Sequence, residues 1–218
     1  MQIEGVKWDY DRSELIADGI VHGVGLLAAI IGVSVLLVLA STHNNAGQIA
    51  AAAIYGAGLI ATLGISFAYN LWPISRTKAV LRRFDHSSIF ILIAGTYTPF
   101  LQNGWSDPFL FSMLLALWGI AAFGVFIKCA FPGRFDRLAI LLYLAMGWSG
   151  VLAAEPLVTR LPEGTLLLIL IGGIVYSAGV IFHVWERLRF QNAIWHGFVV
   201  TAAAIHFSAV LSVLGQSA

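Results

Sequence analysis

The sequence predicts an all-α membrane protein, a single bundle of seven transmembrane helices, and three observations lead to this fold class. Of its 218 residues, 59% are hydrophobic and 11% are charged, with a mean hydropathy of +0.87. Soluble domains are about 45–50% apolar and about 25% charged. Seven stretches are long and apolar enough to cross a bilayer, and turn-forming residues separate them. Residues 1–218 are therefore expected to form one transmembrane domain.

Each span is placed by its apolar run and by the helix breakers beside it. A transmembrane helix needs about 20 mainly apolar residues, within a range of about 17–25. The runs that qualify are residues 19–40, 47–71, 85–102, 109–127, 138–154, 165–185 and 193–214. Residue types that favour turns fill the gaps, at Asn44-Asn45, Trp72-Pro73, Asn103-Gly104 with Pro108, Pro132-Gly133, Pro156 and Pro162. The connections are short, so no soluble domain is expected.

The basic residues predict the orientation of the bundle. Eleven of the twelve fall before the first span or after the second, fourth and sixth spans, and Arg160 alone falls on the other side. Because cytoplasmic loops carry the excess of lysine and arginine, the N-terminus is expected in the cytoplasm and the C-terminus outside. The first apolar run is longer than the 7–15 residues or so of a signal-peptide core, so the N-terminal segment is expected to be retained.

Polar residues of five spans meet at the predicted cytoplasmic ends. In the first span Glu14, Asp18 and His22 are spaced i, i+4, i+8, which places them on one helix face. The others are Ser66, Asn70, Asp85, His86, His183, Glu186, Asn192 and His196. Any one of them could cap a helix or lie at the interface, but ionisable residues inside a membrane commonly mark a functional site. Their convergence predicts a polar pocket near the cytoplasmic leaflet.

Three segments identify a family resemblance. "ELIADGIVHGVG", "LRRFDHSSIFILIAGTYTPF" and "FHVWERLRFQNAIWHGFVV" closely resemble the hemolysin III family, the bacterial branch of the progestin and adipoQ receptor superfamily. The resemblance implies seven helices with a cytoplasmic N-terminus. Better-characterised members of the superfamily resemble hydrolases of the alkaline ceramidase kind, in which three histidines hold zinc near the cytoplasmic face. One histidine closes a Ser-x-x-x-His motif, two form His-x-x-x-His, and an aspartate holds the metal-bound water.

The resemblance assigns roles to residues of this chain. Ser66 and Asp85 fall on the serine and the aspartate of the family pattern and become candidate catalytic residues, together with His196, the last histidine. The other two zinc-ligand positions are Asn70 and Asn192. An amide oxygen is a weak zinc ligand beside imidazole, so zinc is implied by the resemblance while the residues favour a pocket without a metal ion. A metal held through His196 and a neighbour is the alternative.

Three functions are compared. The first is a non-enzymatic protein of a bacterial inner membrane that senses or adjusts lipid state, with membrane lipid as its partner and no nucleic acid. The second is a ceramidase-like intramembrane hydrolase of lipid amides or esters; without zinc it would need His196 or His22 as a general base. The third is a pore-forming cytolysin, which the scarcity of charged residues in the spans disfavours. The sequence favours lipid sensing and leaves the oligomeric state open.

Overall fold

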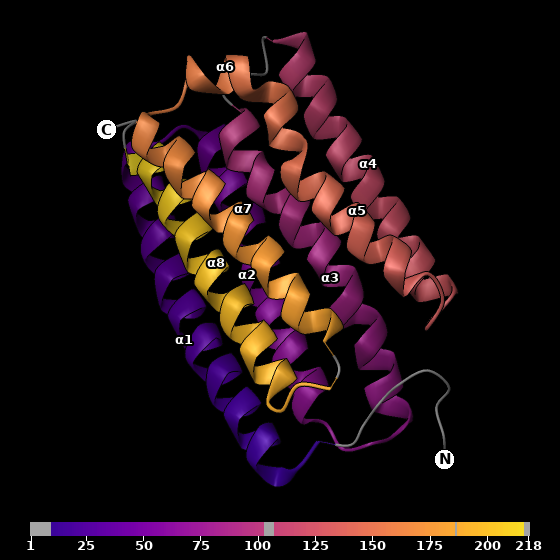
Figure 1. The fold of residues 1–218 in the computed structure, drawn as a ribbon. Helices are drawn as coiled ribbons and strands as arrows, with labels where there is room; N and C mark the ends of the chain where they lie inside the picture. The colour runs from indigo at the N-terminus through magenta and orange to yellow at the C-terminus, as the bar shows by residue number, and fades with distance from the viewer. Residues whose placement is uncertain (1–9, 103–106, 186, 216–218) are drawn as a thin grey trace.

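The computed structural model describes residues 10–102, 107–185 and 187–215, and within these ranges all regular structure is helical. The elements in chain order are α1 (Arg12–His43), α2 (Ala46–Leu71), α3 (Arg76–Leu101), α4 (Pro108–Ala130), α5 (Asp136–Trp148), the 3₁₀ turn η2 (Ser149–Ala153), α6 (Ala154–Val158), α7 (Glu163–Val184) and α8 (Gln191–Gly215). The long helices run side by side in one bundle (Figure 1). The expected all-α membrane fold is confirmed at this level.

Local side-chain contacts explain where the first helices begin. Asp11 accepts a hydrogen bond from the Glu14 backbone N–H at 2.9 Å, and the Glu14 carboxylate accepts one from the Asp11 N–H at 2.9 Å. Asn45 caps α2 in the same reciprocal way, and Ser75 caps α3. These polar first turns lie outside an apolar run but are helical, because capping satisfies the free N–H groups of a helix start.

The third predicted span differs most from the structure. The apolar run begins at residue 85, whereas α3 begins at Arg76 and carries charged side chains along its first third. Within the described residues, six helical segments are long and apolar enough to cross a membrane, and α3 is not among them. The fourth of these segments, Asp136–Val158, combines α5, η2 and α6. A seventh crossing therefore depends on α3, whose charges lower its hydropathy.

The helix in the fifth predicted span is broken at Ser149 by a contact with α3. The Tyr97 hydroxyl donates to the Gly147 carbonyl at 2.8 Å and accepts from the Gly150 N–H at 2.8 Å. A backbone group without a partner is costly in hydrocarbon. Tyr97 satisfies the groups that the break frees, and so permits the change from α-helix to 3₁₀ turn.

Helix α8, the last in the chain, packs against both α1 and α7, while α3 packs against α2 and α4 (Figure 1). The approach of α1 to α8 is close at Gly25, where an added Cβ would lie 2.6 Å from a methyl of Val200. The buried positions of α1 are spaced three or four residues apart and form one inward face: Asp18, His22, Gly25, Ala29, Val33, Leu36 and Ala40. This face turns two ionisable residues into the bundle.

Candidate functional site

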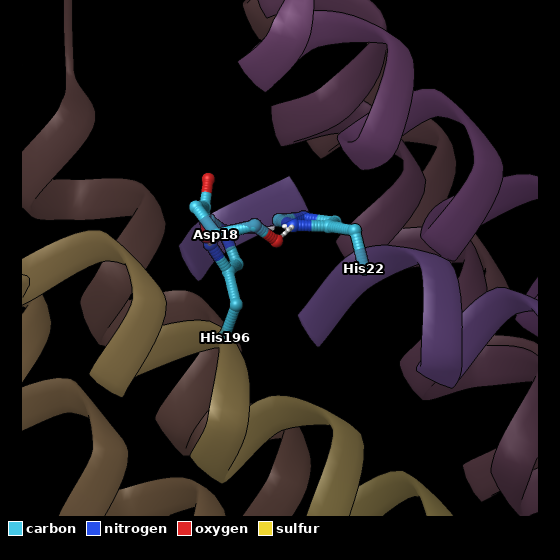
Figure 2. Close-up of side chains that lie close together, drawn as sticks. All are labelled: Asp18, His22 and His196. Carbon is cyan, nitrogen blue, oxygen red and sulfur yellow. Dashed lines mark hydrogen bonds and ion pairs between the residues drawn. The ribbon is translucent and has the colours of Figure 1, made fainter. Parts of the chain in front are cut away.

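Two histidines and one aspartate from opposite ends of the chain point toward one another inside the bundle (Figure 2). Asp18 and His22 lie one turn apart on α1 and are 2% and 1% exposed. His196 comes from the first turns of α8, and its Nδ1 lies 2.7 Å from Asp18 Oδ1. The ring centroids of His22 and His196 are 4.1 Å apart. The buried carboxylate thus has an imidazole partner 178 positions away.

The hydrogen bonds of His22 define which of its nitrogens carries the proton. Nδ1 lies 2.9 Å from the carbonyl oxygen of Asp18, which can only accept, so Nδ1 is the donor. In the neutral ring Nε2 is then an acceptor, and it lies 3.1 Å from Ser66 Oγ. The Ser66 hydroxyl therefore donates to His22. This arrangement leaves a basic nitrogen of His22 directed at the hydroxyl of a serine.

The two asparagines extend this chain of hydrogen bonds. Asn192 Nδ2 donates to Asn70 Oδ1 at 3.2 Å. Asn70 Nδ2 donates to the carbonyl of Ser66 at 2.9 Å and lies 3.3 Å from its hydroxyl. The bonds therefore run in one direction, from α8 through α2 to the carbonyl of Asp18 on α1, an order in which each bond polarises the next. We call Asp18, His22, Ser66, Asn70, Asn192 and His196 the buried polar cluster.

The other predicted pocket residues lie around the cluster or outside it. Asp85 lies on α3 outside the hydrogen bonds that define the cluster, and its backbone carbonyl accepts a hydrogen bond from Ser88 Oγ at 2.8 Å. His183 Nδ1 is buried without a hydrogen-bond partner in the described part of the chain. His86 instead faces α5, where its Nδ1 lies 3.7 Å from an oxygen of Asp136. Glu14 accepts from the Phe190 N–H at 2.9 Å and so fastens the start of α8 to α1.

Glu186 lies outside the described residues. Asp136 was not among the predicted site residues, although it pairs with Arg82 at 2.8 Å and with Lys128. It follows a turn and precedes an apolar run, so its sequence position resembles that of an ordinary helix start. Nothing in the sequence pattern indicates that three other helical positions converge on it.

The zinc site that the resemblance implies does not fit these residues. Of its three imidazole positions, one holds His196. The other two hold Asn70 and Asn192, and the Asn192 amide donates a hydrogen bond to the Asn70 amide oxygen. The donor atoms of Asp18, His22 and His196 do lie within 4.8 Å of one another. However, ligands of a tetrahedral zinc at about 2.0–2.1 Å are about 3.3 Å apart, and the 2.7 Å between His196 and Asp18 is a hydrogen-bond distance. We therefore interpret the cluster as hydrogen-bonded.

Comparison with known proteins places this architecture in a family. A family model described as "Haemolysin-III related" matches residues 13–207. The chain is 37% identical over 198 residues to the Hemolysin-3 homolog of Bacillus subtilis, covering 91% of this chain and 93% of that protein. It is 37% identical to Hemolysin-3 of Bacillus cereus over 91% and 90% of the two chains. It is also 30% identical over 202 residues to the human Monocyte to macrophage differentiation factor, over 90% and 82%.

Proposed function

The chain belongs to the haemolysin-III-related family, and we propose that it is a multi-pass protein of a bacterial inner membrane that binds membrane lipid at the buried polar cluster. In this proposal the polar part of a lipid exchanges hydrogen bonds with the cluster. Its acyl chain lies between the helices, and the occupancy of the site reports or adjusts the lipid state of the membrane.

The observation that carries the proposal is the burial of Asp18 inside an apolar bundle. A carboxylate at this position is costly unless it is paired, and membrane proteins retain such residues mainly where they serve a pathway or a ligand. Here the carboxylate is 2% exposed and bonded to His196. Interhelical hydrogen bonds contribute about 0.6 kcal/mol on average in membranes. This gain is small beside the cost of burying a charge, so helix packing alone does not explain the cluster.

Intramembrane hydrolysis of a lipid ester or amide is the second candidate, and the 3.1 Å contact between His22 Nε2 and Ser66 Oγ favours it. In such a reaction Ser66 Oγ bonds to the carbonyl carbon and its proton passes to His22, which then protonates the leaving alcohol or amine. Water later cleaves the acyl-serine, with His22 again taking and returning the proton. In this candidate reaction a nearby amide such as that of Asn70 would donate to the developing oxyanion.

One pair of probes tests both candidates. A photoactivatable fatty acid should crosslink to segments of α1, α2 and α8, and Ser66→Ala should reduce this crosslinking because it removes a hydroxyl from the cluster. Ser208→Ala is the matched control, since Ser208 is exposed and bonds to its own helix at Ala204. Labelling by a fluorophosphonate that is lost in Ser66→Ala would favour the hydrolase. Crosslinking spread evenly over the bundle, with no fluorophosphonate labelling, would contradict both.

The proposed topology has seven crossings with the basic end of the bundle in the cytoplasm. A reporter that is active only in the cytoplasm should be active when fused after Arg83 or Arg137 and inactive when fused at the C-terminus. The reason is the eleven-to-one distribution of lysine and arginine between the two sides. An active C-terminal fusion would place α8, and with it His196, in the opposite orientation.

A further inference from the structure

A second group of charged side chains lies away from the buried polar cluster, where α3 meets the turn between α4 and α5. A hollow of about 210 Å³, including its open mouth, is lined there by Arg82, Arg83, His86, Lys128 and Gly133 among others. Arg82 and Lys128 both pair with the carboxylate of Asp136. Arg83 Nε is buried without a hydrogen-bond partner in the described residues. Arg82, Arg83 and Lys128 therefore line the hollow while one carboxylate pairs with two of them, and the hollow keeps a surplus of positive charge.

An apolar hollow adjoins the basic one. Its volume, including the space open to the surface, is about 200 Å³. Its lining includes Phe90, Ile127, Phe135, Leu138 and Leu142, from α3, from α4 and from the chain at the start of α5. Lys128 lines both hollows. Phe135 and Leu138 are 50% and 43% exposed and widen this apolar strip on the outer surface of the bundle. Lys128 thus lies between the basic hollow and the apolar hollow, which we call the apolar groove.

These two hollows together match the two parts of one amphiphilic ligand. We propose that they form a binding site for an anionic glycerophospholipid, with its phosphate at Arg82 and Arg83 and an acyl chain along the groove between α4 and α5. Basic pockets between transmembrane helices suit the phosphates of such headgroups, and guanidinium groups bind phosphate through paired hydrogen bonds. Asp136 pairs with Arg82 and with the buried Lys128 and so holds Arg82 at the hollow.

The occupant is a membrane lipid rather than free phosphate because the site has an apolar part as well as a basic part. Free phosphate would contact only the basic side chains, whereas a phospholipid would also place an acyl chain against the apolar groove. The site does not depend on the proposed function of the buried polar cluster, since the lining residues named here lie on α3, on α4 and in the chain around α5. The two proposals can therefore fail separately.

Lipid retention by the purified full-length chain in mild detergent tests this site. The probes are dioleoyl phosphatidylglycerol, dioleoyl phosphatidylcholine and inorganic phosphate, and the readouts are bound lipid by native mass spectrometry and the unfolding temperature. Phosphatidylglycerol should be retained and should raise the unfolding temperature more than either other probe. Arg83→Gln should weaken its binding about fivefold, the factor that corresponds to about 1 kcal/mol for one basic side chain near anionic lipid.

Arg76→Gln is the matched control, because Arg76 is exposed on the same helix and does not line the hollow. It should bind phosphatidylglycerol as the wild type does. Equal binding by Arg83→Gln and Arg76→Gln would overturn the proposal. Equal retention of phosphatidylcholine by the wild type would overturn it as well, as would a stabilisation by inorganic phosphate that matches that of the lipid. The wild-type comparisons decide the question even if Arg83→Gln folds poorly.

Discussion

Asp18→Asn is expected to lower the free energy of unfolding by about 3 kcal/mol. The substitution keeps the shape of the side chain but removes the charge that His196 Nδ1–H meets at 2.7 Å. Exchanging a charged acceptor for a neutral one loses about 1 kcal/mol, and the new amide N–H₂, buried without an acceptor, costs about 2 kcal/mol more. The measurement is reversible unfolding of the purified protein by denaturing detergent or heat.

Asp11→Asn provides the control for this experiment. It makes the same substitution next to the same helix, but Asp11 is exposed and asparagine caps a helix about as well as aspartate. Its unfolding curve should stay close to that of the wild type. Superimposable curves for Asp18→Asn and Asp11→Asn would mean that the Asp18–His196 contact adds nothing to the bundle.

Asn70→His combined with Asn192→His is expected to create a zinc site that holds close to one ion per chain. The two amides already touch at 3.2 Å, and position 192 lies one helical turn before His196. The double variant therefore places three imidazoles around one point, the three-ligand arrangement of catalytic zinc sites. Each single variant supplies two imidazoles and should bind zinc far more weakly. Zinc per chain after chelation and re-addition is the measurement.

A third substitution separates this site from zinc held elsewhere by histidines. Adding His196→Ala to the double variant should abolish binding, because it removes the shared ligand while leaving the two new imidazoles. Tight binding of one zinc by the wild type would contradict the hydrogen-bonded interpretation of Asp18, His22 and His196. A folded double variant that binds no zinc would mean that the cluster has diverged in shape as well as in residue type.

The sequence predicted the helices well because hydropathy reports directly on lipid contact. It predicted their ends less well because capping residues such as Asp11 and Ser75 are polar and fall outside any apolar run. The start of α3 is the clearest case. In its charged first third, Lys78 donates to the carbonyls of Asn70 and Trp72 and Arg82 pairs with Asp136. The distant partner Asp136 leaves no trace in a local pattern.

The sequence indicated which helix ends carry the polar residues, but not which of these residues pair. Positions along each helix placed Asn70, Asn192 and His196 at one end of the bundle, and the structure brings Asn70 and Asn192 into contact. The bond from Asp18 to His196 depends on how α1 and α8 are rotated about their axes. Packing sets that rotation, for example the close approach of Gly25 to Val200, and a single sequence does not contain the identity of the facing helix.

The separation of Asp18 from His196 also bears on how the protein is made. The chain is synthesised from its N-terminus, so α1 leaves the ribosome long before α8. At about 5–20 residues per second, the 178 positions between the two partners take about 10–35 seconds to translate. During that interval the Asp18 carboxylate lacks its final partner, whereas His22 can already bond to Ser66 of α2. The last helix to arrive therefore completes the site.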